Sequence, residues 1–257
     1  MNYELSIVHY ELLIMKKHIP NTITCCNLIS GCAATVFAIY GVPELALSLI
    51  ILGAVFDFFD GMSARLLHVS SEIGKELDSL ADVVTFGVAP SSILYWYLGM
   101  IDYPAFLEPM REVVPFFAYV LAAFSALRLA KFNLDTRQTT SFIGLPTPAD
   151  ALFWGSFIVA FKEEMADEII TLPLIIAGIL FSSWLLVSEV PMFALKFKQW
   201  GFKGNEIKYG FVAFSAICLI GGISYGISTE NYPLCFFPLS LIILAYILVS
   251  ILTQKKQ

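Results

Sequence analysis

The chain has 257 residues, of which 58% are hydrophobic and only 14% are charged. Soluble domains usually carry about 25% charged residues, so the charged fraction of this chain is low. Together with a mean hydropathy of +0.78, it excludes an ordinary soluble protein and indicates an integral membrane protein. The net charge is −6 and no basic tract is present, so we expect no nucleic-acid partner.

Taken from the N-terminus, residues 1–20 are expected to form a short interfacial helix that ends before Pro20, or a tail. A membrane-spanning helix needs about 20 mostly apolar residues. Eight segments meet this condition: 23–40, 43–66, 73–100, 111–133, 146–163, 167–188, 207–228 and 233–253. They lack the short alternating pattern of barrel strands. The sequence therefore predicts an all-α fold, a single polytopic transmembrane bundle of about eight helices.

The basic residues predict how this bundle lies in the membrane. If the N-terminus is cytoplasmic, 13 of the 15 lysines and arginines fall in cytoplasmic segments, and only Arg111 and Lys162 fall outside. This distribution satisfies the positive-inside rule. An even number of helices then places the C-terminus in the cytoplasm as well.

Four aspartates lie in one short segment of this apolar chain, at positions 57, 60, 78 and 82. Ionised side chains at membrane depth are costly, and they are usually functional. Residues three or four apart share a helix face, so two adjacent helices would bring Asp57, Asp60, Asp78 and Asp82 together. Two divalent cations would balance their charge, and carboxylate ligands favour Mg²⁺ or Mn²⁺. Paired ions of this kind assist phosphoryl transfer.

Small residues and an arginine accompany the acids. Gly61 and Ala64 clear side chains from the same face, so that a charged ligand can approach the backbone, and Arg65 offers a fork suited to phosphate. Two alternatives are a purely structural role, with Lys75 or Arg65 neutralising the acids, and an ion-coupled transporter. Neither explains the fixed spacing of the small residues, so we favour a metal-assisted active site.

The motif Asp57-x-x-Asp60-Gly61-x-x-Ala64-Arg65, then eight residues, then Gly74-x-x-x-Asp78-x-x-x-Asp82, resembles the signature of the CDP-alcohol phosphotransferase family. Members transfer a substituted phosphate from a CDP-linked donor to an alcohol and release CMP. The resemblance implies that all four aspartates bind metal and that Asp82 is also the general base. It further implies that the cytidine diphosphate is contacted by Asp57, Gly61, Ala64, Arg65 and Gly74.

Further segments are similar to the membrane-spanning bacterial phosphatidylserine synthases of that family, among them 27–31, 79–90, 128–133 and 142–148. The likeness implies a catalytic core over 21–196, with two additional helices over 207–253. It implies CDP-diacylglycerol and L-serine as substrates, membrane lipids as surroundings and a homodimer. It also implies a multi-pass protein of the bacterial inner membrane with a cytoplasmic active site. A sister enzyme acting on glycerol 3-phosphate or inositol phosphate is the alternative, although these acceptors would require more arginines than residues 128–137 supply.

The acceptor site is predicted at the end of one helix. Arg128, Lys131 and Asn133 lie close together near the cytoplasmic surface, where they could hold the serine carboxylate or the donor phosphate. The alternative is an interfacial anchor, in which long basic side chains reach the lipid headgroups. Lys131 stands where the resemblance predicts arginine, which keeps the charge but loses a bidentate contact.

Overall fold

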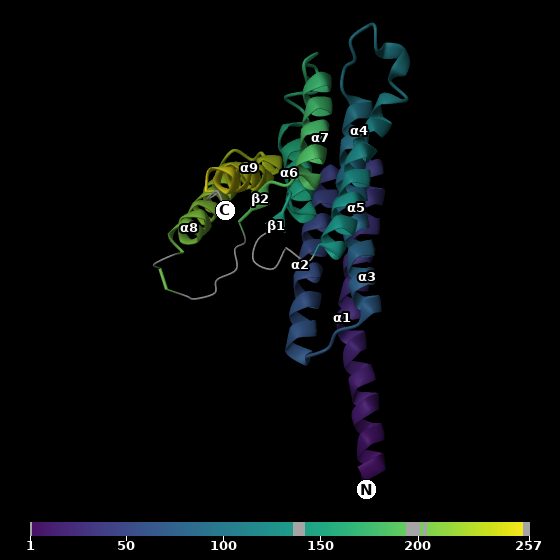
Figure 1. Ribbon diagram of the computed structural model, residues 1–257. Coiled ribbons are helices and arrows are strands. Elements are labelled where there is room, and N and C mark those ends of the chain that lie inside the picture. The colour runs from purple at the N-terminus through teal and green to yellow at the C-terminus, as the bar shows by residue number, and fades with distance from the viewer. Residues whose placement is uncertain (1, 136–141, 194–200, 203–204, 254–257) are drawn as a thin grey trace.

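The computed structural model describes residues 2–135, 142–193, 201–202 and 205–253. Within these ranges the all-α prediction is confirmed. The α-helices are α1 (Asn2–Ile39), α2 (Pro43–Leu67), α3 (Glu72–Asp82), α4 (Ala89–Met100), α5 (Tyr119–Leu134), α6 (Thr147–Phe161), α7 (Thr171–Val187), α8 (Glu206–Ser228) and α9 (Phe237–Leu252) (Figure 1). Part of the predicted basic segment, residues 136 and 137, lies outside the described residues.

Among the described residues, six helical segments are long and apolar enough to cross a membrane: His18–Ile39, Pro43–Leu67, Glu72–Met100, Val114–Leu134, Glu206–Ser228 and Tyr232–Leu252. The protein is therefore a multi-pass membrane protein. The two remaining expected spans are the shorter helices α6 and α7, with 15 and 17 residues. At 1.5 Å per residue they are about 22 and 26 Å long, less than the ~30 Å hydrocarbon core.

The first helix differs from the prediction. A helix ending before Pro20 was expected, but α1 continues through Pro20 to Ile39 without a break. Proline removes one backbone hydrogen bond from a helix interior. The Thr24 hydroxyl oxygen lies 3.1 Å from the Pro20 carbonyl oxygen at this turn.

The third span is one continuous helical segment with a wide turn in its middle. Helix α3 ends at Asp82, a π-helical turn η1 (Val83–Val88) follows directly, and α4 begins at Ala89. Pro90 has no backbone N–H, so a regular α-helical ladder cannot be completed there. Wide turns of this type are rare and are found mostly at functional sites.

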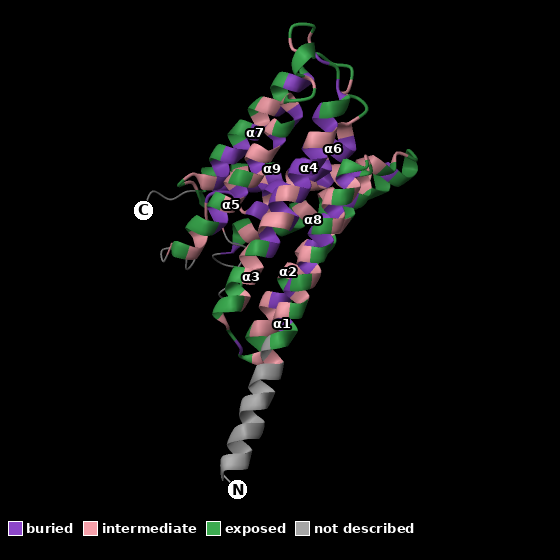
Figure 2. Cartoon of the chain, turned by 90° about the vertical axis from the view of Figure 1, so that its right-hand side faces the viewer, coloured by how far each residue is buried: buried purple, intermediate pink, exposed green. Residues whose placement is uncertain are grey.

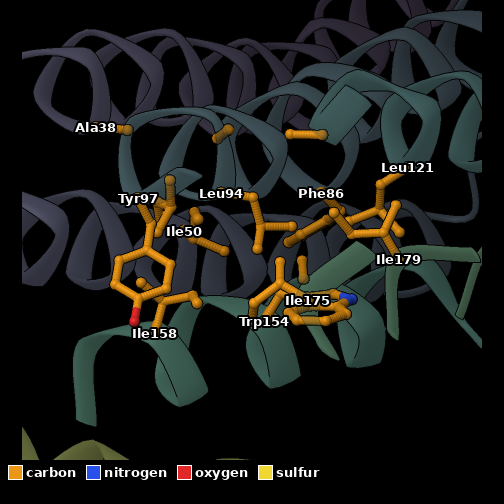
Figure 3. Close-up of a cluster of buried hydrophobic side chains, with 14 of the residues drawn as sticks. Ala38, Ile50, Phe86, Leu94, Tyr97, Leu121, Trp154, Ile158, Ile175 and Ile179 are labelled. Carbon is orange, nitrogen blue, oxygen red and sulfur yellow. The ribbon is translucent and has the colours of Figure 1, made fainter. Parts of the chain in front are cut away.

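The core is centred on α4, where buried residues gather (Figure 2). Leu94 and Tyr97 are fully buried and lie in one cluster with Ile50 of α2, Trp154 of α6 and Ile175 of α7 (Figure 3). Many large apolar side chains elsewhere remain exposed, such as those on α8 at positions 217 and 220. An outward apolar surface is what a lipid environment requires.

A short pair of strands and the last two helices complete the fold. Strands β1 (Phe142–Ile143) and β2 (Pro191–Met192) pair antiparallel, which the sequence did not indicate, and they join the segments before α6 and after α7. Helices α8 and α9 lie at one flank of the bundle (Figure 1). Helix α9 packs on α6, where the hydroxyls of Ser156 and Ser240 are hydrogen-bonded at 2.9 Å.

Candidate active site

The structure brings three of the four predicted acids together. Asp57 and Asp60 come from α2 and Asp78 comes from α3, and one carboxylate oxygen of each lies within 4.8 Å of those of the other two. Among the described side chains, no lysine or arginine forms an ion pair with this group. Lys75 lines the adjoining pocket, but its Nζ atom donates to the backbone carbonyl oxygen of Asn133. Hard oxygen ligands that converge in this way fit divalent cations such as Mg²⁺ or Mn²⁺.

Asp82 lies beside this group but is not part of it. It follows Asp78 by one helical turn and is 8% exposed. Its Oδ1 atom accepts a hydrogen bond from Asn27 Nδ2 at 3.3 Å, and it interacts electrostatically with Asp57 and Asp78. The four acids therefore form a group of three with a fourth carboxylate next to it, whereas the sequence predicted that all four would meet in one group.

Helix α1 supplies a row of polar side chains that face the acids, one turn apart, at positions 21, 24 and 27. The Thr24 hydroxyl donates to Asp60 Oδ2 at 2.6 Å, and Asn27 donates to Asp82. Sequence reasoning missed Thr24. The signal was available, because polar residues at i, i+3 and i+6 on an apolar helix form one face.

A pocket of about 280 Å³ opens next to the acids between α1, α2 and the start of α3. Gly61, Ala64 and Gly74 line it together with Asp60 and Asp78. These small residues determine its shape, as two of the glycines show.

A Cβ atom at Gly74 would lie 2.8 Å from Ser71 Oγ and 2.9 Å from Asn21 Oδ1, so a larger residue would displace both neighbours. Ser71 also accepts a hydrogen bond from the Gly74 backbone N–H at 3.0 Å and caps α3. Arg65 does not line the pocket. Its guanidinium nevertheless lies beside Gly61: a Cβ atom added at Gly61 would be 3.6 Å from the Nη1 atom of Arg65.

A second pocket, of about 250 Å³, lies between the end of α5 and the segment after α7. Arg128 and Lys131 both line it. Arg128 is only 7% exposed, its guanidinium stacks over the Phe132 ring at 5.0 Å, and its Nε atom has no hydrogen-bond partner among the described residues. Lys131 is exposed, and its Nζ atom donates to the Val187 carbonyl oxygen at 3.1 Å.

Asn133 does not belong to this second pocket. Its side-chain amide donates to Ser79 Oγ at 2.8 Å, and its backbone carbonyl oxygen accepts from Lys75 Nζ at 3.2 Å. Asn133 therefore joins α5 to α3. Arg128 interacts electrostatically with Asp82.

Comparison with known proteins identifies the family of this chain. The CDP-alcohol phosphatidyltransferase family model matches residues 17–195. The chain is 39% identical over 132 residues to a CDP-diacylglycerol–serine O-phosphatidyltransferase of Bacillus subtilis (strain 168), covering 51% of this chain and 70% of that protein. Proteins of the same name from Helicobacter pylori (strain ATCC 700392 / 26695) and Methanocaldococcus jannaschii are similar too. They are 31% identical over 186 residues and 32% identical over 173 residues, covering 72% and 67% of this chain and 75% of each relative. The chain belongs to the CDP-alcohol phosphatidyltransferase family.

Proposed function

We propose that this protein transfers the phosphatidyl group of CDP-diacylglycerol to the hydroxyl of L-serine and produces phosphatidylserine and CMP. The observation that carries the proposal is the convergence of Asp57, Asp60 and Asp78 beside a pocket lined by Gly61, Ala64 and Gly74. Relatives from bacteria and an archaeon, named for this same reaction, support it.

The carboxylates would hold two divalent cations, Mg²⁺ or Mn²⁺. Asp57, Asp60 and Asp78 form the first ligand group, and Asp82, one helical turn after Asp78, would complete a second. Bound cations of this kind neutralise phosphate charge and stabilise the attacking and leaving oxygens of a displacement.

The pocket next to the acids suits the cytidine diphosphate. Gly61, Ala64 and Gly74 allow a phosphate or a flat base to approach the backbone. Asp57 belongs to the adjoining acid group and would contact the diphosphate from there. The Arg65 guanidinium lies beside Gly61, where it would pair with phosphate oxygens. The acyl chains would remain among the lipids, beside the exposed apolar side chains of α2.

Asp82 is the residue placed to accept a proton. It is buried, held by Asn27, and adjacent to the acid group. In the reaction, its free carboxylate oxygen takes the proton of the serine hydroxyl. The serine oxygen bonds to the lipid-bearing phosphorus, the bond from that phosphorus to the CMP oxygen breaks, and CMP leaves with the electron pair. A positioned general base typically contributes about 10²–10⁴-fold to the rate.

The second pocket is the proposed site for the serine carboxylate. Arg128 has an Nε atom without a partner in the described part of the chain, and its charge interacts with Asp82, the proposed proton acceptor. Serine carries no phosphate, so one buried guanidinium with Lys131 at the rim supplies enough positive charge. Asn133 acts indirectly, by holding α5 against α3.

The proposal extends to the surroundings of the enzyme. The core of residues 21–196 would be catalytic, and the two helices over 207–253 would support it. The charge distribution favours cytoplasmic termini and an active site that faces the cytoplasm at the bacterial inner membrane. A homodimer is the assembly we propose to test by mass measurement in detergent.

An acceptor panel tests the function. Purified protein with CDP-diacylglycerol and Mg²⁺ or Mn²⁺ is given L-serine, glycerol 3-phosphate or inositol phosphate, and CMP and lipid products are measured. We expect CMP release and phosphatidylserine with serine. Preferred use of a phosphorylated acceptor would indicate a sister enzyme, and the absence of CMP release with every alcohol would favour a transporter.

A further inference from the structure

Asn27 lies within the first membrane-spanning helix and has no exposed surface. A carboxamide buried in an apolar region is destabilising unless it is hydrogen-bonded, so its partners indicate its role. Its Nδ2 atom donates to Asp82 Oδ1 at 3.3 Å. Asn27 thus connects a helix that carries none of the four acids to the proposed proton acceptor.

Asn27 is itself held by the wide turn that follows Asp82. Thr85, inside that π-helical turn, donates from its hydroxyl to the Asn27 backbone carbonyl oxygen at 3.1 Å. The π-helical turn therefore has two links to this site. It holds the Asn27 backbone through Thr85, and it continues directly from Asp82, to which the Asn27 side chain donates.

Two glycines allow this close approach. A Cβ at Gly31 of α1 would lie 2.7 Å from the Thr85 Cα atom. A Cβ at Gly53 of α2 would lie 2.9 Å from Asn27 Oδ1 and 2.5 Å from Thr85 Cγ2. Real Cβ atoms do not approach backbone or packed side chains this closely, so α1, α2 and the turn fit together only with glycine at both positions. The position of Asn27 is therefore determined from three sides.

We propose that Asn27 is a positioning residue for Asp82. By donating to Oδ1, it fixes the carboxylate rotamer and leaves Oδ2 as the oxygen presented to the acceptor hydroxyl. Asn27 acts through Asp82 and touches neither substrate. The inference rests on the proposed function, in which Asp82 accepts the serine proton.

The test compares Asn27→Leu and Asn27→Asp with the wild type. Both replacements are close to asparagine in size and remove the N–H donors. We expect kcat for phosphatidylserine formation to fall about 10–100-fold, a large part of what a general base contributes. The KM values for serine and CDP-diacylglycerol should stay close to wild type. Thr85→Val, which loses only the hydroxyl that holds the Asn27 backbone, should lower kcat in the same direction by less.

Thr35→Val is the matched control on the same helix, because the Thr35 hydroxyl donates only within α1, to the Gly31 carbonyl oxygen at 2.9 Å. It should keep the wild-type kcat. Unchanged kcat in both Asn27 variants would overturn the inference. So would a selective rise in the KM for serine, which would make Asn27 a substrate contact. If wild type forms no phosphatidylserine, the proposed function fails, whereas failure of the Asn27 variants to differ from an active wild type refutes this inference alone.

Discussion

Replacing Arg128 with alanine should weaken serine binding far more than binding of CDP-diacylglycerol. Arg128 is 7% exposed and its Nε atom has no partner in the ranges that the structure describes, so this buried N–H is available to a carboxylate. Losing a charge-assisted hydrogen bond costs roughly 1.5–3 kcal/mol, or about 10–150-fold in the KM for serine. The substitution also removes the stack over Phe132, worth about 2 kcal/mol of stability at a buried position.

The assay measures initial rates of phosphatidylserine formation while each substrate is varied in turn. Arg128→Lys should give an intermediate KM for serine, because it keeps the charge and loses the fork. Lys131→Ala is the control. Its ammonium is exposed and bonded to a backbone carbonyl, so the KM should rise only a fewfold. Equal rises in both KM values would place Arg128 at the donor phosphate, and unchanged KM values with lower thermal stability would make it an interfacial anchor.

Three further predictions follow from the site and its packing. Asp82→Asn should lower kcat by at least about 10²-fold while CDP-diacylglycerol binding, measured directly, persists; near-normal turnover would remove Asp82 from the chemistry. Exhaustive chelation with EDTA should abolish activity, Mg²⁺ or Mn²⁺ should restore it, and Ca²⁺ should inhibit because its looser coordination misplaces the reacting oxygens. Full activity after chelation would contradict the metal-site interpretation. Gly31→Ala should destabilise the protein by about 1–3 kcal/mol, seen as a lower Tm in detergent, because the new methyl group meets Thr85. Gly99→Ala, where a Cβ meets nothing within 4 Å, is its control, and equal Tm values for the two variants would refute the packing argument.

The long helices and the acid group could be predicted from the sequence, each for a physical reason. Ionised side chains are so unfavourable in apolar helices that Asp57, Asp60 and Asp78 at helical spacing strongly predict a shared site. The long spans were equally clear, because 20 apolar residues in a row have few other structures. The helices α6 and α7 are shorter than expected, because the charged residues counted at their ends, such as Lys162, Glu163 and Asp167, lie in the connection between them.

The details of the site depended on tertiary structure. Helical periodicity put Asp82 in line with Asp78, but the hydrogen bond from Asn27 holds it beside the group of three. The π-helical turn after Asp82 leaves no clear signal in the sequence except Pro90.

The acceptor region shows the same limit. Asn133 was grouped with Arg128 by sequence distance alone, and its direction toward Ser79 is set by the packing of α5 on α3. The pairing of β1 with β2 involves two residues on each side, too few to produce a periodic pattern.

The central claim is that this carboxylate site transfers a phosphatidyl group to serine with the help of divalent cations. The most direct measurement follows labelled L-serine into lipid together with CMP release, using metal-stripped protein before and after Mg²⁺ or Mn²⁺ is added. We expect no product before the metal is added, and one CMP released for each phosphatidylserine formed afterwards. Labelled lipid formed without added metal, or CMP released without incorporation of serine, would contradict it.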